Sequence, residues 1–376
     1  MSTPKRMLDL AARLALRGAG LVEPNPMVGA VIVRDGQVIG RGHHRRYGGL
    51  HAEREAIDDC VAGGGDPRGA TMYVTLEPCA REGKQPPCTK AIIEAGIAHV
   101  VYAAADPHPK GHGGATDLAR AGVRVDLSDE SPLATGVSAP FRRCVTSGLP
   151  WVIAKWAQTI DGRVATRTGE SRWISGDGAR RRVHQLRARV DAIITGIGTA
   201  VADDPMLTAR GVRVRRTARR VVADNDLDLP LDSALVRSAR EVPLTIACLA
   251  DLVGSGIMKD KQDALERAGV EILGVPHGVN AHRLDPRAML RLLHERHGVS
   301  TAMLEAGPGL TGAFLEADLI DEARVYVAPM MLGDELAASV AVGRVAESLR
   351  AGKRFDLWRV KPIGGDVEIT YRRPGV

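Results

Sequence analysis

Hydrophobic and polar positions along the first 130 residues predict helices and strands in alternation. Apolar residues recur at helical spacing over 5–19, which predicts an amphipathic first helix. An apolar run at 28–33 ends at Asp35-Gly36, which predicts a buried strand and a tight hairpin turn. A helix is expected to begin near His51 and to end at Gly63. Further strands are predicted at 71–76, 100–104 and 123–127, and further helices at 89–95 and 115–121. This alternation predicts a three-layer α/β/α domain.

The same alternation starts again after residues 145–150, which have the composition of a linker. Strands are predicted at 151–154 and near 191–196, 220–223, 243–248, 270–274, 300–304 and 323–328. We therefore predict an α/β protein with two domains, 1–146 and 150–376.

The composition narrows the possible partners. Of the 376 residues, 44% are hydrophobic, enough for a sizeable core, but only 3% are aromatic. So few aromatic residues argue against a stacking platform for single-stranded nucleic acid. The formal net charge of +6 suits a phosphorylated substrate or cofactor, and by itself it leaves nucleic acid open.

Cysteine usage and the N-terminus indicate the compartment. The chain has five cysteines, an odd number, and no disulfide framework is implied. Charged residues alternate with the apolar residues of the first helix, a pattern that signal peptides do not have. No apolar run is long enough to span a membrane. We expect a cytoplasmic protein without a membrane partner.

His51, Cys79 and Cys88 form the strongest chemical pattern. One imidazole and two thiolates fill three corners of a tetrahedral zinc site and leave the fourth for water. Glu53 lies two residues beyond His51, as in the zinc-dependent base deaminases, and is the expected proton shuttle. Zinc lowers the pKa of water from about 15.7 to about 7, which yields a nucleophile at neutral pH. Cys88 is expected to open a helix whose positive end favours a thiolate. The alternatives are a structural zinc site or two unrelated core thiols.

Other residues are weaker candidates. Asn25, held between two prolines at a strand entrance, either presents its amide to a ligand or forms a turn. His43 and His44 are either substrate contacts or surface histidines. Glycine turns at 195–200 and 305–312 follow predicted strands, and such turns bring backbone N–H groups to a phosphate. A true Rossmann fold is disfavoured because no acidic ribose-binding residue follows the second turn.

Taken together, these motifs resemble the bifunctional riboflavin-biosynthesis deaminase–reductase family. In the first half the resemblance rests on PNPMVGAVIV at 24–33, HAE at 51–53, TLEPC at 75–79 and PPC at 86–88. In the second half it rests on TIDG at 159–162, GESRWIS at 169–175, the stretch 184–210 and EAGP at 305–308. The resemblance implies a cytidine-deaminase-like domain followed by a dihydrofolate-reductase-like domain.

The family also implies a reaction sequence with Zn²⁺ and NADPH as cofactors. The first domain would deaminate 2,5-diamino-6-(5-phosphoribosylamino)pyrimidin-4(3H)-one. The second would reduce the ribosyl group of 5-amino-6-(5-phosphoribosylamino)uracil to ribityl. NADPH positions carried over from the family are Ala157, Trp173, Thr199, Asp203, Gly307, Pro308, Gly309, Leu310, Thr311, Gly312 and Ala313. The expected substrate positions are Asn25, Lys84, Lys155, Ser171, Arg187, Leu207, Arg210 and Glu305. Lys155 is the candidate for polarising the sugar C1, unless it only pairs with a nearby acid. A homo-oligomer is expected.

Three positions depart from the family pattern. Arg81 stands where the family has histidine, Gln85 where it has threonine, and Asn225 where it has serine. These departures concern substrate and NADPH contacts and leave the metal pattern intact. Two other interpretations remain at this stage: a nucleic-acid base deaminase with an appended binding domain, and a catalytically silent zinc scaffold.

Overall fold

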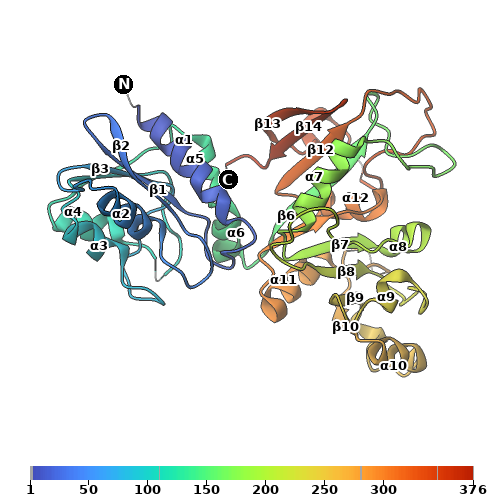
Figure 1. Ribbon diagram of the computed structural model, residues 1–376. Coiled ribbons are helices and arrows are strands. Elements are labelled where there is room, and N and C mark those ends of the chain that lie inside the picture. Colours follow the sequence, from blue (N-terminus) through green and yellow to red (C-terminus); the bar gives the residue numbers. More distant parts are fainter. Residues whose placement is uncertain (1–2, 110, 280–281, 345, 376) are drawn as a thin grey trace. The chain divides into compact units, whose positions relative to one another are not determined.

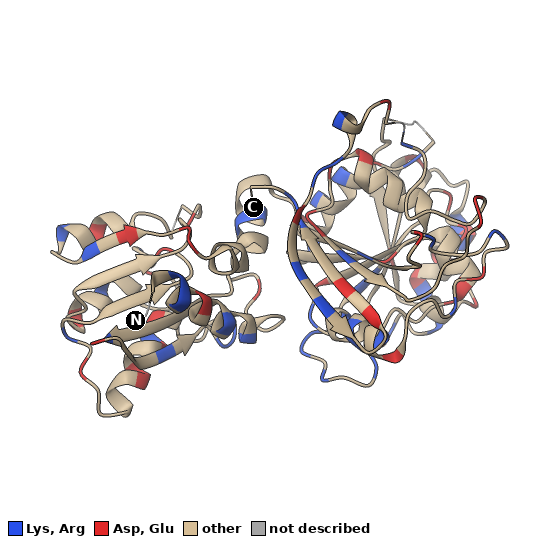
Figure 2. Ribbon diagram, turned by 90° about the horizontal axis from the view of Figure 1, so that it is seen from above, with Lys and Arg blue, Asp and Glu red and all other residues tan. Residues whose placement is uncertain are grey.

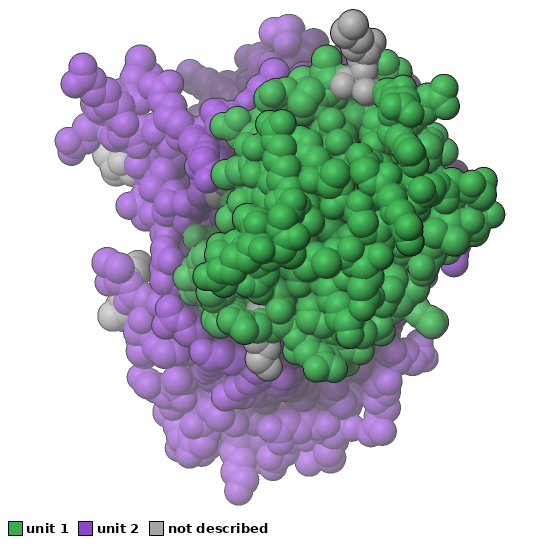
Figure 3. Space-filling view, turned by 90° about the vertical axis from the view of Figure 1, so that its left-hand side faces the viewer, with its two compact units in different colours: residues 1–148, 376 green, residues 149–375 purple. Residues whose placement is uncertain are grey.

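The computed structural model describes residues 3–109, 111–279, 282–344 and 346–375. It divides into two compact units, one ending at Gly148 and the other spanning Leu149–Gly375, which Figure 3 shows in different colours. The linker predicted at 145–150 is mostly wrong, because helix α6 (Ala139–Ser147) continues through residue 147. That helix ends at Gly148, whose φ of 65° is the left-handed conformation that closes many helices.

The first unit is built on a five-stranded sheet in the order β2-β1-β3-β4-β5 (Figure 1). Its strands are β1 (Gly29–Arg34), β2 (Gln37–His43), β3 (Thr71–Val74), β4 (His99–Tyr102) and β5 (Arg124–Leu127). β1 runs antiparallel to both of its neighbours, whereas β3, β4 and β5 are parallel. The carboxyl ends of β3 and β4 therefore open at the same edge of the sheet.

Helices cover both faces of this sheet, which confirms the predicted three-layer domain. On one face lie α1 (Pro4–Ala15) and α5 (Pro132–Val137), whose apolar side chains pack on β1, β3 and β4. On the other lie α2 (Ala52–Ala62), α3 (Cys88–Glu94) and α4 (Gly114–Arg120). The first helix is shorter than the predicted 5–19, since a 3₁₀ turn (Leu16–Gly18) follows Ala15.

The second unit contains a nine-stranded sheet in the order β10-β9-β8-β7-β11-β6-β12-β14-β13. Its strands are β6 (Trp151–Gln158), β7 (Ala192–Gly196), β8 (Arg219–Ala223), β9 (Leu244–Leu249), β10 (Val270–Val275), β11 (Thr301–Leu304), β12 (Glu322–Val327), β13 (Asp356–Ile363) and β14 (Asp366–Arg372). The first seven in spatial order are parallel. The antiparallel hairpin β13–β14 extends the sheet beyond β12. The sequence did not predict this hairpin, because β13 is exposed over most of its length and has no apolar run.

The helices of the second unit are α7 (Asp177–Arg187), α8 (Ile197–Asp203), α9 (Ala234–Arg237), α10 (Lys259–Arg267), α11 (Pro286–His297) and α12 (Pro308–Glu316), with 3₁₀ turns at Ala250–Leu252 and Leu349–Ala351. The main core lies where α11 and α12 pack on the central strands β6, β7, β8 and β11. The carboxyl ends of these four parallel strands share one edge, which is where open α/β sheets bind ligands.

Charged residues of both signs are distributed over both units (Figure 2). In the part of the chain that the structure describes, no helix combines the length and the apolar character needed to cross a bilayer.

Candidate active sites

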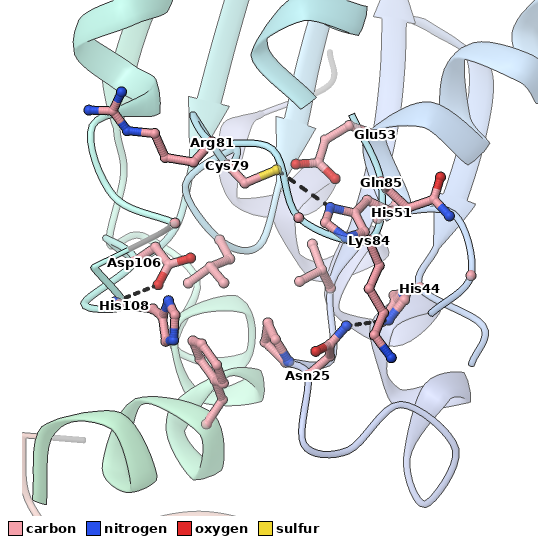
Figure 4. Close-up of a pocket in the computed structure, with 18 of the residues that line it drawn as sticks. Asn25, His44, His51, Glu53, Cys79, Arg81, Lys84, Gln85, Asp106 and His108 are labelled. Carbon is pink, nitrogen blue, oxygen red and sulfur yellow. Dashed lines mark hydrogen bonds between the residues drawn. The ribbon is translucent and has the colours of Figure 1, made fainter. Parts of the chain in front are cut away.

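Three side chains from three elements converge in the first unit. His51 immediately precedes α2, Cys79 follows β3 and Cys88 is the first residue of α3. His51 Nδ1 lies 3.2 Å from Cys88 Sγ. It lies 3.6 Å from Cys79 Sγ, the contact that Figure 4 shows as a dashed line. Tetrahedral zinc with bonds of about 2.0 Å to nitrogen and about 2.3 Å to sulfur would separate such donors by about 3.5 Å. The donor set therefore fits zinc, and among the described residues the group contains no fourth protein ligand.

The two thiols differ in their acidity. The hydrogen bond from Cys88 lowers the pKa of Cys79 to about 4, whereas the same bond and burial raise the pKa of Cys88. The sequence predicted that the start of α3 favours a thiolate at Cys88. Without metal the pKa of Cys88 is instead raised, and Cys79, which also accepts the backbone N–H of Cys88 at 3.3 Å, is the more acidic thiol. A metal cation that binds both sulfurs favours the thiolate of each.

Glu53 lies in the first turn of α2 and lines a cavity of about 250 Å³ together with His51 and Cys79. Its side chain is 4% exposed. Burial is the main reason that its pKa rises to about 7, and the nearby Cys79 thiolate adds to the effect. A carboxyl group with a pKa near neutrality is suited to accept and to release a proton at the pH of the cell.

Asn25 and His44 form a fixed hydrogen-bonding pair in the wall of this cavity. His44 Nδ1 lies 2.8 Å from the carbonyl oxygen of Leu50, so this nitrogen carries the hydrogen. His44 Nε2 then accepts from the amide of Asn25 at 3.2 Å. Burial lowers the pKa of His44, which keeps the ring neutral. The Asn25 side-chain oxygen is therefore left as an acceptor at the cavity. His44 is only 2% exposed, which excludes the interpretation as a surface histidine.

The loop between the two cysteines forms the opposite rim. Lys84 Nζ lies 4.0 Å from the centre of the Tyr47 ring, a cation–π contact that holds the ammonium at the cavity. Gln85 donates to the carbonyl oxygen of Gly48 at 3.2 Å and so connects the two rim loops. Arg81 and Gln85, the two departures from the family pattern, both line the cavity.

Glu77 and Gly114 hold the loop that follows β4 against the metal site. The buried Glu77 carboxylate accepts the backbone N–H groups of Asp106, Gly113 and Ala115 at 3.0–3.2 Å. A Cβ on Gly114 would lie 1.8 Å from the carbonyl oxygen of Pro78, the residue before Cys79. The site thus depends on this close contact, and only glycine permits it. Glu77 lies in the TLEPC motif, but the sequence assigned no role to it, and no motif singled out Gly114.

In the second unit, Glu305 forms ion pairs with two cationic side chains at the edge of the sheet where the parallel strands end. Lys155 on β6 places Nζ 3.0 Å from Glu305 Oε1. Arg187 on α7 lies 2.9 Å from Oε2, and it also donates to the carbonyl oxygen of Thr208 at 3.1 Å. Burial raises the pKa of Glu305, but Lys155 and Arg187 outweigh burial and lower it to about 2. This carboxylate is therefore charged at neutral pH.

The glycine turn after β11 leads into α12, and Gly307 is its N-cap residue. The Gly307 N–H donates to the Thr199 hydroxyl at 3.1 Å, which joins the turn to α8. A Cβ on Gly312 would lie 1.9 Å from the carbonyl oxygen of Val342, so α12 packs directly on the 339–343 segment. The turn exposes backbone N–H groups at a helix N-terminus, which suits a dinucleotide phosphate.

A cavity of about 1040 Å³ collects most of the predicted reductase residues. Those that line it are Lys155, Ala157, Ser171, Trp173, Arg187, Thr199, Asp203, Leu207, Arg210, Glu305, Gly307, Pro308, Gly309, Leu310 and Ala313. Two predicted cofactor residues, Thr311 and Gly312, are not among the lining residues, since Thr311 is buried and Gly312 faces Val342. Asn225 does line the cavity, as does His184, which the sequence patterns did not single out.

Fold and sites together define a zinc-dependent deaminase joined to a dinucleotide-dependent reductase. Residues 1–104 match the cytidine and deoxycytidylate deaminase zinc-binding region, and residues 150–368 match the RibD C-terminal domain. The riboflavin biosynthesis protein RibD of Aquifex aeolicus is 35% identical over 371 residues, covering 98% of both chains. That of Escherichia coli is 35% identical, covering 95% of this chain and 96% of its own. The chain belongs to the bifunctional RibD family of riboflavin biosynthesis.

Solved structures agree with this assignment. A Thermotoga maritima deaminase/reductase, described as acting on diaminohydroxyphosphoribosylaminopyrimidine and 5-amino-6-(5-phosphoribosylamino)uracil, has a TM-score of 0.80 at 30% identity and 98% coverage of both chains. Acinetobacter baumannii RibD has a TM-score of 0.78 at 33% identity, also covering 98% of both chains. The predicted fold class, both enzyme activities and both cofactor classes are confirmed, and the nucleic-acid deaminase and silent scaffold interpretations lose their support.

Proposed function

We propose that the first unit deaminates 2,5-diamino-6-(5-phosphoribosylamino)pyrimidin-4(3H)-one. The second unit then reduces the ribosyl group of the resulting 5-amino-6-(5-phosphoribosylamino)uracil to ribityl with NADPH. The observation that carries the proposal is the presence, in one chain, of the His51–Cys79–Cys88 group beside Glu53 and of the Lys155–Glu305–Arg187 group beside the glycine turn.

In the deaminase, His51, Cys79 and Cys88 would hold zinc, which would supply a Lewis acid and lower the pKa of water to about 7. Glu53 would accept one proton from the attacking water and deliver it to the ring nitrogen. It would then transfer the second proton, from the hydroxyl group formed on the ring carbon, to the departing ammonia. Asn25 accepts a hydrogen bond from the substrate through its free oxygen, and Lys84 contacts the base or the phosphate. The burial of Glu53 supports this role because it keeps the pKa of the carboxyl group near 7.

In the reductase, NADPH would supply a hydride to C1 of the opened ribose. The residues of the glycine turn that line the cavity, Gly307, Pro308, Gly309, Leu310 and Ala313, would hold the dinucleotide together with Ala157, Trp173, Thr199 and Asp203. Lys155 polarises the C1 oxygen, and Glu305 orients the ammonium of Lys155. Ser171, Arg187, Leu207 and Arg210 bind the remainder of the substrate. The alternative interpretation of Lys155, pairing with a nearby acid, is compatible with this role because the pair lines the cavity.

A coupled assay tests the proposal. The purified zinc-loaded protein is incubated with the diaminopyrimidine phosphate and NADPH, and ammonia release and NADPH oxidation are followed together. We expect both, with NADPH oxidation depending on prior deamination. The absence of both products in the presence of zinc would refute the assignment.

The remaining expectations concern the domain borders and the surroundings of the enzyme. The domains 1–146 and 150–376, a homo-oligomeric state, a cytoplasmic location and the absence of a nucleic-acid or membrane partner remain part of the proposal. Gel filtration with light scattering at several concentrations measures the oligomeric state, and a mass of one chain at every concentration would exclude the homo-oligomer.

A further inference from the structure

The cations that line the reductase cavity fall into two classes. Four of them are paired with carboxylates: Lys155 and Arg187 with Glu305, Arg172 with Asp203, and Arg180 with Asp177. The other two are Arg210 and Arg283. Among the residues that the structure describes, no carboxylate lies within ion-pair distance of either guanidinium. The cavity therefore offers two arginines for the phosphates of its ligands.

The two unpaired arginines belong to different regions of the cavity. Arg210 donates its backbone N–H to His184 Nδ1 at 3.2 Å, and His184 lies one helical turn before Arg187 on α7. Since Arg187 holds Glu305, Arg210 belongs to the region where Lys155 lies. In the proposed function, the guanidinium of Arg210 binds the phosphate of the substrate.

Arg283 belongs to the region beyond β8. The backbone N–H of the next residue, Leu284, donates to the Asn225 side-chain oxygen at 3.1 Å, and Asn225 follows β8. The Arg283 carbonyl oxygen accepts from Gly278 at 2.8 Å, which fixes its backbone. Three strand spacings, β6 to β11 to β7 to β8, separate this region from Lys155. At about 4.8 Å per spacing this is about 14 Å, so the cavity is long enough for an extended dinucleotide.

The strand order also gives the direction of the cofactor. The nicotinamide must reach the C1 position near Lys155, and the Gly307 turn after β11 lies between β6 and β7. A diphosphate at that turn would leave the adenosine over β7 and β8, next to Asn225 and Arg283. This arrangement rests on the proposed reductase function.

We propose that Arg283 binds the 2′-phosphate of NADPH and that this contact makes the enzyme prefer NADPH to NADH. A guanidinium presents paired N–H donors that match a phosphate. An NADH site would instead offer a carboxylate to the ribose 2′-hydroxyl. Asp224 at the end of β8 does not serve this purpose. It is fully buried, and its carboxylate accepts the N–H groups of Asp228 and Leu229, both at 2.9 Å.

The test compares Arg283→Gln with Arg291→Gln. Arg291 is an exposed residue of α11 outside the cavity, so its substitution makes the same change in charge without touching the site. Calorimetric titration with 2′,5′-ADP and with 5′-AMP measures binding without turnover. Steady-state kinetics with NADPH and with NADH, using the deaminated pyrimidine, measures the preference between cofactors.

We expect Arg283→Gln to weaken 2′,5′-ADP binding and to raise the KM for NADPH by about 10- to 100-fold, the usual loss for a charge-assisted hydrogen bond. The KM for NADH, the binding of 5′-AMP and kcat should stay unchanged, and Arg291→Gln should behave as the parent protein. Equal losses for both cofactors, or no loss for NADPH, would overturn the role of Arg283. A parent protein that oxidises neither cofactor would instead refute the proposed reductase function.

Discussion

Lys155 on β6 forms an ion pair with Glu305, the residue that follows the adjacent strand β11, with 3.0 Å between Nζ and Oε1. The other carboxylate oxygen holds Arg187 at 2.9 Å. Glu305 thus determines where two cations lie in the reductase cavity. Because its pKa is lowered to about 2, it does so as a permanent anion at neutral pH.

Replacing Glu305 by Gln should abolish most of the reductase activity and spare the deaminase. The amide does not anchor both cations, so Lys155 loses its orientation and kcat/KM should fall by about 10²- to 10³-fold. The measurement is NADPH oxidation with the deaminated pyrimidine, beside ammonia release from the diamino substrate. Glu316→Gln, which breaks a surface pair with Arg344, is the matched control. A variant that keeps its reductase rate would show that the pair has only a structural role.

Replacing Glu53 by Gln should separate metal binding from deamination. The zinc donors remain, so the metal content should stay at that of the parent protein. Ammonia release should fall by about 10²- to 10⁴-fold, because the proton shuttle is lost. Elemental analysis and an ammonia assay measure the two quantities. NADPH oxidation with the deaminated pyrimidine should be unaffected. Loss of zinc would instead identify Glu53 as a ligand, and unchanged ammonia release would refute its role as shuttle.

The sequence predicted a site correctly when its chemistry allows only a few residue types. It predicted helices and strands correctly when their apolar periodicity is strong. His51, Cys79 and Cys88 were recognised before their proximity was known, since few donor sets bind zinc. The buried parallel strands were found from their apolar runs. The hairpin β13–β14 was missed because its outer strand is polar and exposed.

Contacts between segments distant in sequence were also beyond prediction. Glu77 accepts backbone N–H groups from residues 106–115, and any residue type can provide a backbone N–H. The same holds for the close approach of Gly114 to Pro78, because a glycine in a sequence does not show what lies against it. Arg283 is a candidate because four of the other five lysine and arginine side chains in the cavity are paired with carboxylates and the fifth, Arg210, lies near Lys155.

Replacing Gly114, which is not a zinc ligand, by Ala should weaken zinc binding. The new methyl group would lie 1.8 Å from the Pro78 carbonyl oxygen, so α4 or the turn before Cys79 must move. We expect a loss of about 1–3 kcal/mol in stability, the usual cost of overpacking, and weaker zinc retention against a chelator. Gly83→Ala, in the cavity rim with open space around its Cβ position, is the control and should be neutral. Equal zinc retention in both variants would contradict the tight contact.

The reductase unit should lose stability in acid through Glu322 on β12. This carboxylate is 1% exposed and pairs with Arg324 at 2.6 Å and Arg372 at 3.0 Å. Burial raises its pKa, but the two arginines outweigh burial and lower it from 4.5 to about 2. A carboxyl group with a lowered pKa in the folded state stabilises the fold above its unfolded pKa. That contribution is lost as the pH falls from about 4.5 toward about 2.

Glu322→Gln isolates this contribution. At pH 7 the variant removes the carboxylate from two largely buried guanidinium groups and should be less stable by about 3–5 kcal/mol. The difference from the parent protein should shrink as the pH is lowered, because the parent carboxyl group then becomes protonated as well. All four tryptophans, Trp151, Trp156, Trp173 and Trp358, lie in the second unit, so urea unfolding followed by tryptophan fluorescence reports on this unit alone. Glu335→Gln, at an exposed loop position, serves as the control. A difference between Glu322→Gln and the parent protein that stays constant between pH 7 and pH 3 would show that the pKa of Glu322 is not lowered.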